Sequence, residues 1–197
     1  MTSRERILGA IQANQPTLIA LPDAYTFETT YPDLTAQFAS VLASIGGLSI
    51  EVADYLAIEI HLQQLFPQQL DVVTTIPTLA HVADVSLVHI LDPHDLAHIN
   101  LAIIEGQWAV AENGAIWVDE RHLPHRALPM ITQYLAIVIR KSAIVSNMHE
   151  AYKRIRVDET GFGTFIAGPS KTADIEQSLV IGAHGARSLV VYVLNDL

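Results

Sequence analysis

The feature that most constrains the fold is a set of short, strongly apolar runs. Two of them, Tyr134–Arg140 and Ser188–Leu194, are rich in Val, Ile and Leu. Runs of this length and composition are typical of strands buried on both faces of a sheet. Further strand-like segments are 48–52, 71–76, 101–104, 116–118 and 164–167, with 85–91 as a less regular candidate.

Helical patterns separate these runs. Ser3 begins an amphipathic helix to about residue 14, and Asp33 caps a helix to about Ile45 that Gly46-Gly47 ends. Strands that alternate with helices favour a mostly parallel sheet in an α/β fold. We therefore expect a single domain over 1–197, with the N-terminal helix preceding the main sheet. The remaining predictions are helices over 53–66 and 146–156, the latter capped by Ser146, a short helix from Asp92-Pro93, and loops over 15–32 and 121–129.

The carboxyl-terminal stretch 161–197 predicts a strand–helix–strand unit. Its first apolar run stops at Gly168-Pro169, which cannot continue a central strand. Ser170 or Thr172 then caps a predicted helix that ends near Gly182, with Asp174 and Glu176 in its first turn. The loop between strand and helix would lie at the carboxyl edge of a parallel sheet, where ligands tend to bind.

This loop is the first candidate site. Exposed backbone N–H groups over Gly168–Thr172, the hydroxyls of Ser170 and Thr172 and the charge of Lys171 form a receptor for a carboxylate or phosphate, if a helix begins there. The alternative is a capped turn that only ends a strand, with Lys171 in solvent.

The second candidate is the loop of His184, Gly185, Ala186 and Arg187. A glycine-flanked histidine can donate a hydrogen bond or move a proton near neutral pH, and Arg187 can bind a carboxylate. This loop enters its strand at the amino end, so we expect it at the edge opposite to Gly168–Thr172. The alternative is a turn histidine that satisfies local backbone groups.

The third candidate is Glu112 beside the turn signal Asn113-Gly114. A buried glutamate there is a candidate catalytic carboxylate, with Gly114 as a ligand-binding position. The alternative is a structural turn in which Glu112 caps a nearby N–H group. Trp108 and Trp117 flank this turn and belong either to a pocket wall or, more commonly, to the core or an interface.

Composition narrows the partners. The net charge is -10, and no basic cluster of the kind that nucleic acid requires is visible. No apolar run reaches the eighteen or so residues of a membrane span, and residues 1–6 are polar and charged, so we expect a cytoplasmic protein. Half of the residues are hydrophobic, which fits a sheet buried on both faces or a hidden interface in a homo-oligomer.

Two residue types bear on metals and cofactors. Cysteine is absent, which removes thiolate ligands for a conventional iron–sulfur cluster. Nine histidines are present, and His94 and His98 lie four apart on a predicted helix. A metal needs three or four converging ligands, so we expect a solvated acidic helix and no metal site here.

Sequence motifs at both ends and in the middle resemble the LUD-domain family of lactate-utilisation proteins. They are GPSKTADIE (168–176) followed by HGAR (184–187), SRERILGAIQ near the amino end and AENGAIWV (111–118). Lys171 stands where the family usually has Arg, Ala186 where it has Pro, and Asn113 where it has Thr. The resemblance implies a three-layer α/β/α fold similar to the sugar-isomerase and CoA-transferase superfamily, in which AENG is similar to the motif that carries a glutamate nucleophile.

The resemblance also implies a function, and three hypotheses follow. The first is a non-redox component of a system that oxidises L-lactate to pyruvate, binding a small carboxylate or phosphorylated ligand, with the iron–sulfur clusters on partner proteins. The second is a stand-alone enzyme of the CoA-transferase or sugar-phosphate isomerase type that uses Glu112. The third is an interaction domain with a vestigial pocket.

Overall fold

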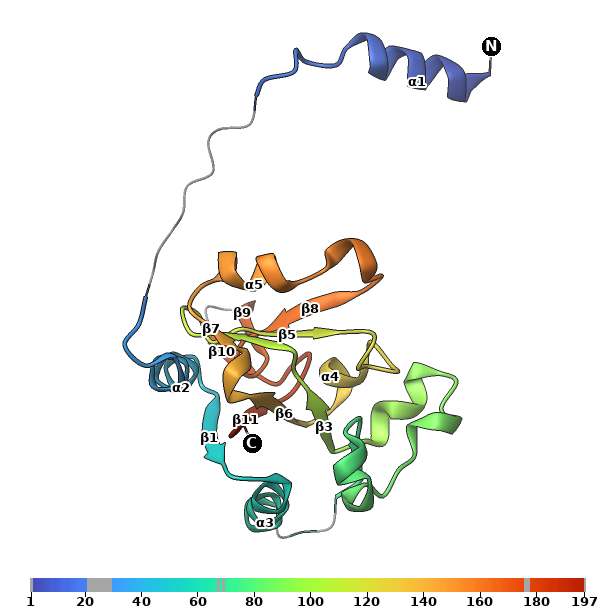
Figure 1. The fold of residues 1–197 in the computed structure, drawn as a ribbon. Helices are drawn as coiled ribbons and strands as arrows, with labels where there is room; N and C mark the ends of the chain where they lie inside the picture. Colours follow the sequence, from blue (N-terminus) through green and yellow to red (C-terminus); the bar gives the residue numbers. More distant parts are fainter. Residues whose placement is uncertain (1, 21–29, 67, 69, 176–177, 197) are drawn as a thin grey trace.

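The computed structural model describes residues 2–20, 30–66, 68, 70–175 and 178–196, with the backbone alone for 173–175 and 178–179. At its centre lies a five-stranded sheet in the order β1-β11-β6-β3-β2, in which all strands are parallel (Figure 1). This confirms the predicted α/β class and parallel sheet. The strands are β1 (Leu48–Val52), β2 (Val72–Thr74), β3 (Leu101–Glu105), β6 (Tyr134–Arg140) and β11 (Ser188–Leu194).

Both faces of this sheet are buried, because successive side chains of a strand point to opposite faces. On β6, Ile137 and Ile139 pack into one core, and Val138 packs into the other. The helix α3 (Tyr55–Leu65) covers the second face, and α2 (Leu34–Ser44) contributes to the first. The high apolar content is therefore used on both sides of the central sheet.

A second sheet lies over the first face, in the order β7-β4-β5-β8. The strand β5 is antiparallel to β4 and β8, while β7 is parallel to β4. Helix α5 packs on the outer side of this sheet (Figure 1). The first face is thus covered by a sheet as well as by helices, which differs from the simple three-layer prediction. The elements are β4 (Trp108–Val110), β5 (Ile116–Asp119), β7 (Ile144–Val145), β8 (Gly163–Ile166) and α5 (Met148–Arg154).

The turn at Asn113-Gly114 explains why residues 108–119 form a hairpin. The Asn113 side chain accepts the Ala115 N–H group, and Gly114 has a φ of 70°, the left-handed conformation that such turns require. The chain reverses there, and Trp108 pairs directly with Trp117 across β4 and β5. The turn explains the hairpin but not its place in a second sheet, which depends on pairing with the distant strands β7 and β8.

The helix predicted between Ser170 and Gly182 is wrong. This segment forms an antiparallel pair of strands, β9 (Lys171–Ile175) and β10 (Ser178–Ile181). The Thr172 hydroxyl donates to the Val180 carbonyl across the pair. Residues such as Thr, Val and Ile favour extended backbone, and here they outweigh the capping pattern. Glu176 and the side chain of Asp174 lie outside the described residues.

Two other predicted elements differ. Residues 85–91 are not a strand, because the 3-10 helix η2 (Leu87–His89) lies there. The cap of α5 is Asn147, whose side chain accepts the Glu150 N–H group, and not Ser146. The other 3-10 helices and the short helix α4 are η1 (Pro77–Val82), η3 (Pro93–His98), α4 (Leu128–Ile131), η4 (Lys141–Ala143) and η5 (Val157–Glu159).

The amino-terminal helix α1 (Ser3–Ala13) confirms the sequence pattern but buries no residue. It begins with a capping box in which Thr2 and Glu5 exchange hydrogen bonds. Its apolar side chains Ile7, Leu8 and Ile11 are exposed. Residues 21–29 of the predicted loop lie outside the described residues. Among the described helices, none has the length and apolarity to cross a membrane.

Candidate functional site

The carboxyl ends of three parallel strands meet at one edge of the central sheet. There β2 ends at Thr74, β3 at Glu105 and β6 at Arg140. Two cavities open at this edge, one of about 720 Å³ and one of about 360 Å³. Glu105 and Arg121 line both of them. This edge is therefore the candidate site, in the place where open parallel sheets commonly bind ligands.

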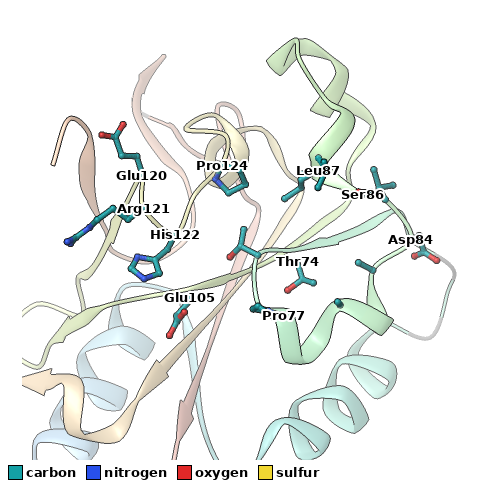
Figure 2. A pocket seen from close by; sticks show the side chains of 15 residues that line it. Thr74, Pro77, Asp84, Ser86, Leu87, Glu105, Glu120, Arg121, His122 and Pro124 are labelled. Carbon is teal, nitrogen blue, oxygen red and sulfur yellow. The ribbon is translucent and has the colours of Figure 1, made fainter.

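The larger cavity is lined by polar and apolar side chains in similar numbers (Figure 2). Its size lies within the range of small-molecule pockets. Figure 2 shows His122 and Glu105 on one wall and Asp84 and Ser86 across from them. Thr75 also lines this cavity, and its buried hydroxyl has no hydrogen-bond partner within the described residues. The cavity thus offers hydroxyls, carboxylates and an imidazole to a polar ligand.

Asp119, the last residue of β5, organises one wall of this cavity. Its side chain is fully buried, and it accepts hydrogen bonds from the backbone N–H, Nε and Nη2 of Arg121, the last at 2.6 Å. It also contacts Nδ1 of His122 at 3.2 Å. One buried carboxylate therefore positions two of the cavity-lining side chains.

The charge of Asp119 follows from opposing effects. Burial raises the pKa of this carboxyl, but hydrogen bonds from Arg121 and His122 lower it by more, so the net pKa lies below the ordinary value of 3.8. Asp119 is then ionised at neutral pH. Its contact with Nδ1 of His122 leaves Nε2 as the ring atom that a ligand can meet, as in other carboxylate–histidine pairs.

The predicted anion loop lies at the opposite, amino edge of the central sheet. The Ser170 N–H group donates to the Ala186 carbonyl at 2.8 Å, and Ala186 lies two residues before the start of β11. The predicted carboxyl-edge position is wrong because β8, which precedes the loop, belongs to the second sheet. The prediction that Gly168–Thr172 and the His184 loop lie at opposite edges is wrong for the same reason, since the two loops are in contact.

Lys171 and Gly168 make local contacts at the end of α2. The Lys171 ammonium donates to the carbonyl of Ile45, where a cation is favourable beside the negative end of the helix. Gly168 has a φ of 72°, and a Cβ added to it would lie 2.8 Å from the same carbonyl oxygen. These contacts fix the loop against the end of α2. No helix begins in the loop, so the helix N-terminus that the predicted anion site required is missing.

The predicted side chains of Glu112, His184 and Arg187 are exposed, whereas Gly114 is buried. The Glu112 carboxylate accepts the N–H group of Met148, the first residue of α5, at 3.1 Å and lines neither of the two cavities. The burial expected for a catalytic glutamate is absent. His184 and Arg187 are also exposed, and the Arg187 backbone N–H donates to the Gln133 carbonyl at 2.8 Å. The catalytic and ligand-binding roles assigned to these residues stay predictions.

Sequence reasoning assigned none of the carboxyl-edge residues to a site, and it placed Arg121 and His122 only within the predicted loop 121–129. A signal was present: Asp119 directly follows the apolar run 116–118, and Arg121 and His122 come next. The two tryptophans divide between the suggested roles, since Trp117 is buried in a core and Trp108 lines the smaller cavity. The described residues contain no group of three or more side chains placed to hold a metal ion.

Comparison with known proteins gives one family and several relatives. The LUD domain model matches residues 93–194, which run from η3 to the end of β11. Lactate utilization protein C of Shouchella clausii is 36% identical over 93 residues, 44% of this chain and 40% of that protein. Lactate utilization protein C of Geobacillus thermodenitrificans is 30% identical over 112 residues, 54% of this chain and 46% of that protein. The chain thus spans less than half the length of these relatives.

A solved structure supports the fold. The crystal structure of a DUF162 family protein from Deinococcus radiodurans superposes with a TM-score of 0.61. The match covers 82% of this chain and 96% of that one, at 21% sequence identity. At this identity the likeness concerns the fold alone.

Proposed function

The chain belongs to the LUD domain family, and from that premise we propose that it is a non-redox component of an L-lactate utilisation system. The observation that carries the proposal is its homology to lactate utilization protein C. The family segment 93–194 includes Glu105, Asp119, Arg121 and His122, so it supplies much of the carboxyl-edge site.

Composition supports the non-redox part of the proposal. The chain has no cysteine, and conventional iron–sulfur clusters are held by cysteine thiolates. The oxidation of lactate to pyruvate releases two electrons, which then pass to redox centres on partner proteins. We place iron–sulfur proteins among those partners and assign none of the redox chemistry to this chain.

The larger cavity is the proposed binding site for the hydroxy acid or its keto product. Asp119 occupies Nε and Nη2 of Arg121, which leaves Nη1 for a ligand carboxylate. Glu105 and the Thr75 hydroxyl are suited to accept or share the proton of a ligand hydroxyl. Because Asp84, Glu105 and Glu120 also line this cavity, it disfavours ligands with several negative charges. A ligand with one carboxylate and one hydroxyl fits this combination of one arginine and several acidic or hydroxyl groups.

Fold similarity extends the proposal one step. We place the parallel sheet in the sugar-isomerase and CoA-transferase superfamily, which the family resemblance implies. The exposed, helix-capping position of Glu112 gives no support to a covalent mechanism through that residue. The stand-alone enzyme hypothesis therefore has no observation in its favour.

Calorimetric titration with L-lactate and pyruvate tests the ligand. We expect His122→Ala to weaken binding of the ligand at least about tenfold, the loss of one charge-assisted or strong hydrogen bond. The matched control is His184→Ala, which removes an exposed histidine at the other edge of the sheet and should leave binding unchanged. Absence of saturable binding of either acid to the wild-type chain would remove the ligand assignment.

A second experiment tests the role itself. Affinity purification from cells grown on L-lactate should recover cysteine-rich iron–sulfur proteins with this chain, and deletion should impair growth on L-lactate. Normal growth after deletion, with the chain recovered alone, would contradict the proposal.

A further inference from the structure

We infer that the smaller cavity at the carboxyl edge is a binding site for a multiply charged phosphate group. Four arginines line this cavity of about 360 Å³: Arg121, Arg140, Arg154 and Arg156. The whole chain has eleven basic and twenty-one acidic residues, so more than a third of its cations lie around this one space. This inference does not rest on a role in lactate utilisation.

The arginines come from separate parts of the fold. Arg140 ends the central strand β6, Arg154 ends α5, and Arg156 follows that helix. Like charges that converge repel one another, so such a cluster is unfavourable unless it is compensated. Carboxylates outside the cavity offset part of this cost. A bound anion would offset the rest, because guanidinium groups form paired hydrogen bonds with phosphate oxygens.

Three of the arginines are held in place by neighbouring carboxylates that do not line the cavity. Arg121 binds Asp119 at 2.6 Å, Arg154 binds Glu150 at 3.1 Å, and Arg156 binds Glu159 at 2.6 Å. The Arg154 guanidinium also lies over the Trp108 ring, 5.4 Å from its centre. These contacts use some of the donors of each guanidinium and leave others for a ligand.

Arg140 differs from the other three. Within the described part of the chain it forms no ion pair, although it lies at the carboxyl end of a central strand and its side chain lines the cavity. Because no carboxylate pairs with Arg140, its charge is the one that an incoming anion would neutralise with the largest gain in binding free energy. Arg140 is therefore the key binding residue of the proposed site.

The charge balance distinguishes this cavity from its larger neighbour. Glu105 is the acidic side chain among its lining residues, against four arginines. A single carboxylate is satisfied by one arginine fork, whereas the remaining free donors of four guanidinium groups match an anion with several oxygens. A phosphate or diphosphate group has this chemistry, and 360 Å³ accommodates it.

The two cavities share Glu105 and Arg121. In Figure 2 Arg121 extends away from Asp84 and Ser86, the far wall of the larger cavity. A phosphorylated compound bound to the arginines would thus place the rest of its structure beside His122. The inferred ligand class is a small phosphorylated compound whose phosphate occupies the arginine cavity.

Titration calorimetry with inorganic pyrophosphate tests the inference, at constant ionic strength because exposed charges are screened by salt. We expect saturable binding to the wild-type chain, and at least about tenfold weaker binding to Arg140→Ala. Arg140 is exposed and unpaired within the described residues, so its removal should not disturb folding, and circular dichroism checks this. Arg6→Ala is the matched control, since it removes an exposed arginine of α1, a helix that buries no residue, and should leave pyrophosphate binding unchanged.

Three results would overturn the inference. They are no saturable pyrophosphate binding to the wild-type chain, equal weakening by Arg140→Ala and Arg6→Ala, and equally tight binding of citrate with the same dependence on Arg140. The last result would mark a polycarboxylate site in place of a phosphate site. L-lactate binding to the same variants separates this inference from the proposed function, because Arg140 does not line the larger cavity.

Discussion

At the scale of single residues, a buried carboxylate does more for the site than any of the exposed groups. The buried Asp119 carboxylate positions Arg121 and His122. The free-energy cost of its desolvation is offset by the hydrogen bonds that these two residues donate. Replacing Asp119 would leave the donors of Arg121 and His122 without an acceptor. The resulting loss of stability exceeds the net contribution of the hydrogen bonds themselves. The ionisation of Asp119 is therefore a stability determinant as well as a positioning device.

Asp119→Asn should lower the free energy of unfolding by about 2 kcal/mol at pH 7, as expected for charge-assisted hydrogen bonds. Because the folded pKa of Asp119 lies below 3.8, the unfolded state binds more protons in that region. The stability that the ionised carboxylate contributes is thus present above its unfolded pKa and is lost as the pH falls through its folded pKa. Urea denaturation from pH 7 to pH 3 should show the difference between wild type and variant shrinking below about pH 4.

Asp158→Asn is the control for that series, because its carboxylate is exposed and only weakly paired. It should leave the unfolding free energy almost unchanged across the range. A gap between wild type and Asp119→Asn that stays constant with pH would contradict the role assigned to ionisation.

At the scale of elements, the junction between β8 and β9 is anchored to the carboxyl end of α2. Gly168 is left-handed and close to the Ile45 carbonyl, and Lys171 donates to that same oxygen. These contacts give the GPSK motif a structural role at the amino edge of the central sheet.

Gly168→Ala should destabilise the fold by roughly 1–3 kcal/mol, because alanine is strained in this conformation and its Cβ would meet the Ile45 oxygen. Chemical denaturation measures the change. Gly9→Ala is the matched control: its Cβ would meet nothing within 4 Å, and alanine favours the helix α1. Equal effects of the two substitutions would argue against the tight junction.

Lys171→Ala separates the structural role of this lysine from the predicted ligand-binding role. It should cost roughly 0.5–1 kcal/mol of stability through the lost contact with α2. Binding of L-lactate and of pyrophosphate should be unchanged in calorimetry. Loss of binding with an intact fold would return the ligand site to the GPSK loop.

These elements also show what the sequence determines and what it leaves open. The strands 48–52, 134–140 and 188–194 have the predicted bounds. In the last two, continuous apolar runs reflect burial on both faces. Local patterns do not name pairing partners, so they assigned β8 to the parallel sheet although it pairs with β5. The same error moved the GPSK loop to the wrong edge and gave it a helix.

At the scale of the whole molecule, the two edges of the parallel sheet differ in structure. The amino edge is closed by contacts between Ser170 and Ala186 and between Arg187 and Gln133. The carboxyl edge is open and polar, and it concentrates four arginines in a chain of net charge -10. Sequence order hides this concentration, because Arg121, Arg140 and Arg156 meet only after β5, β6 and α5 have packed.

Crystals of the chain grown with L-lactate and pyrophosphate would locate the ligands most directly. We expect density for the phosphate among Arg140, Arg154 and Arg156, and density for the hydroxy acid beside His122. Ligand density at Ser170, Lys171 or His184, with both carboxyl-edge cavities filled only by solvent, would contradict the assignment of binding to the carboxyl edge.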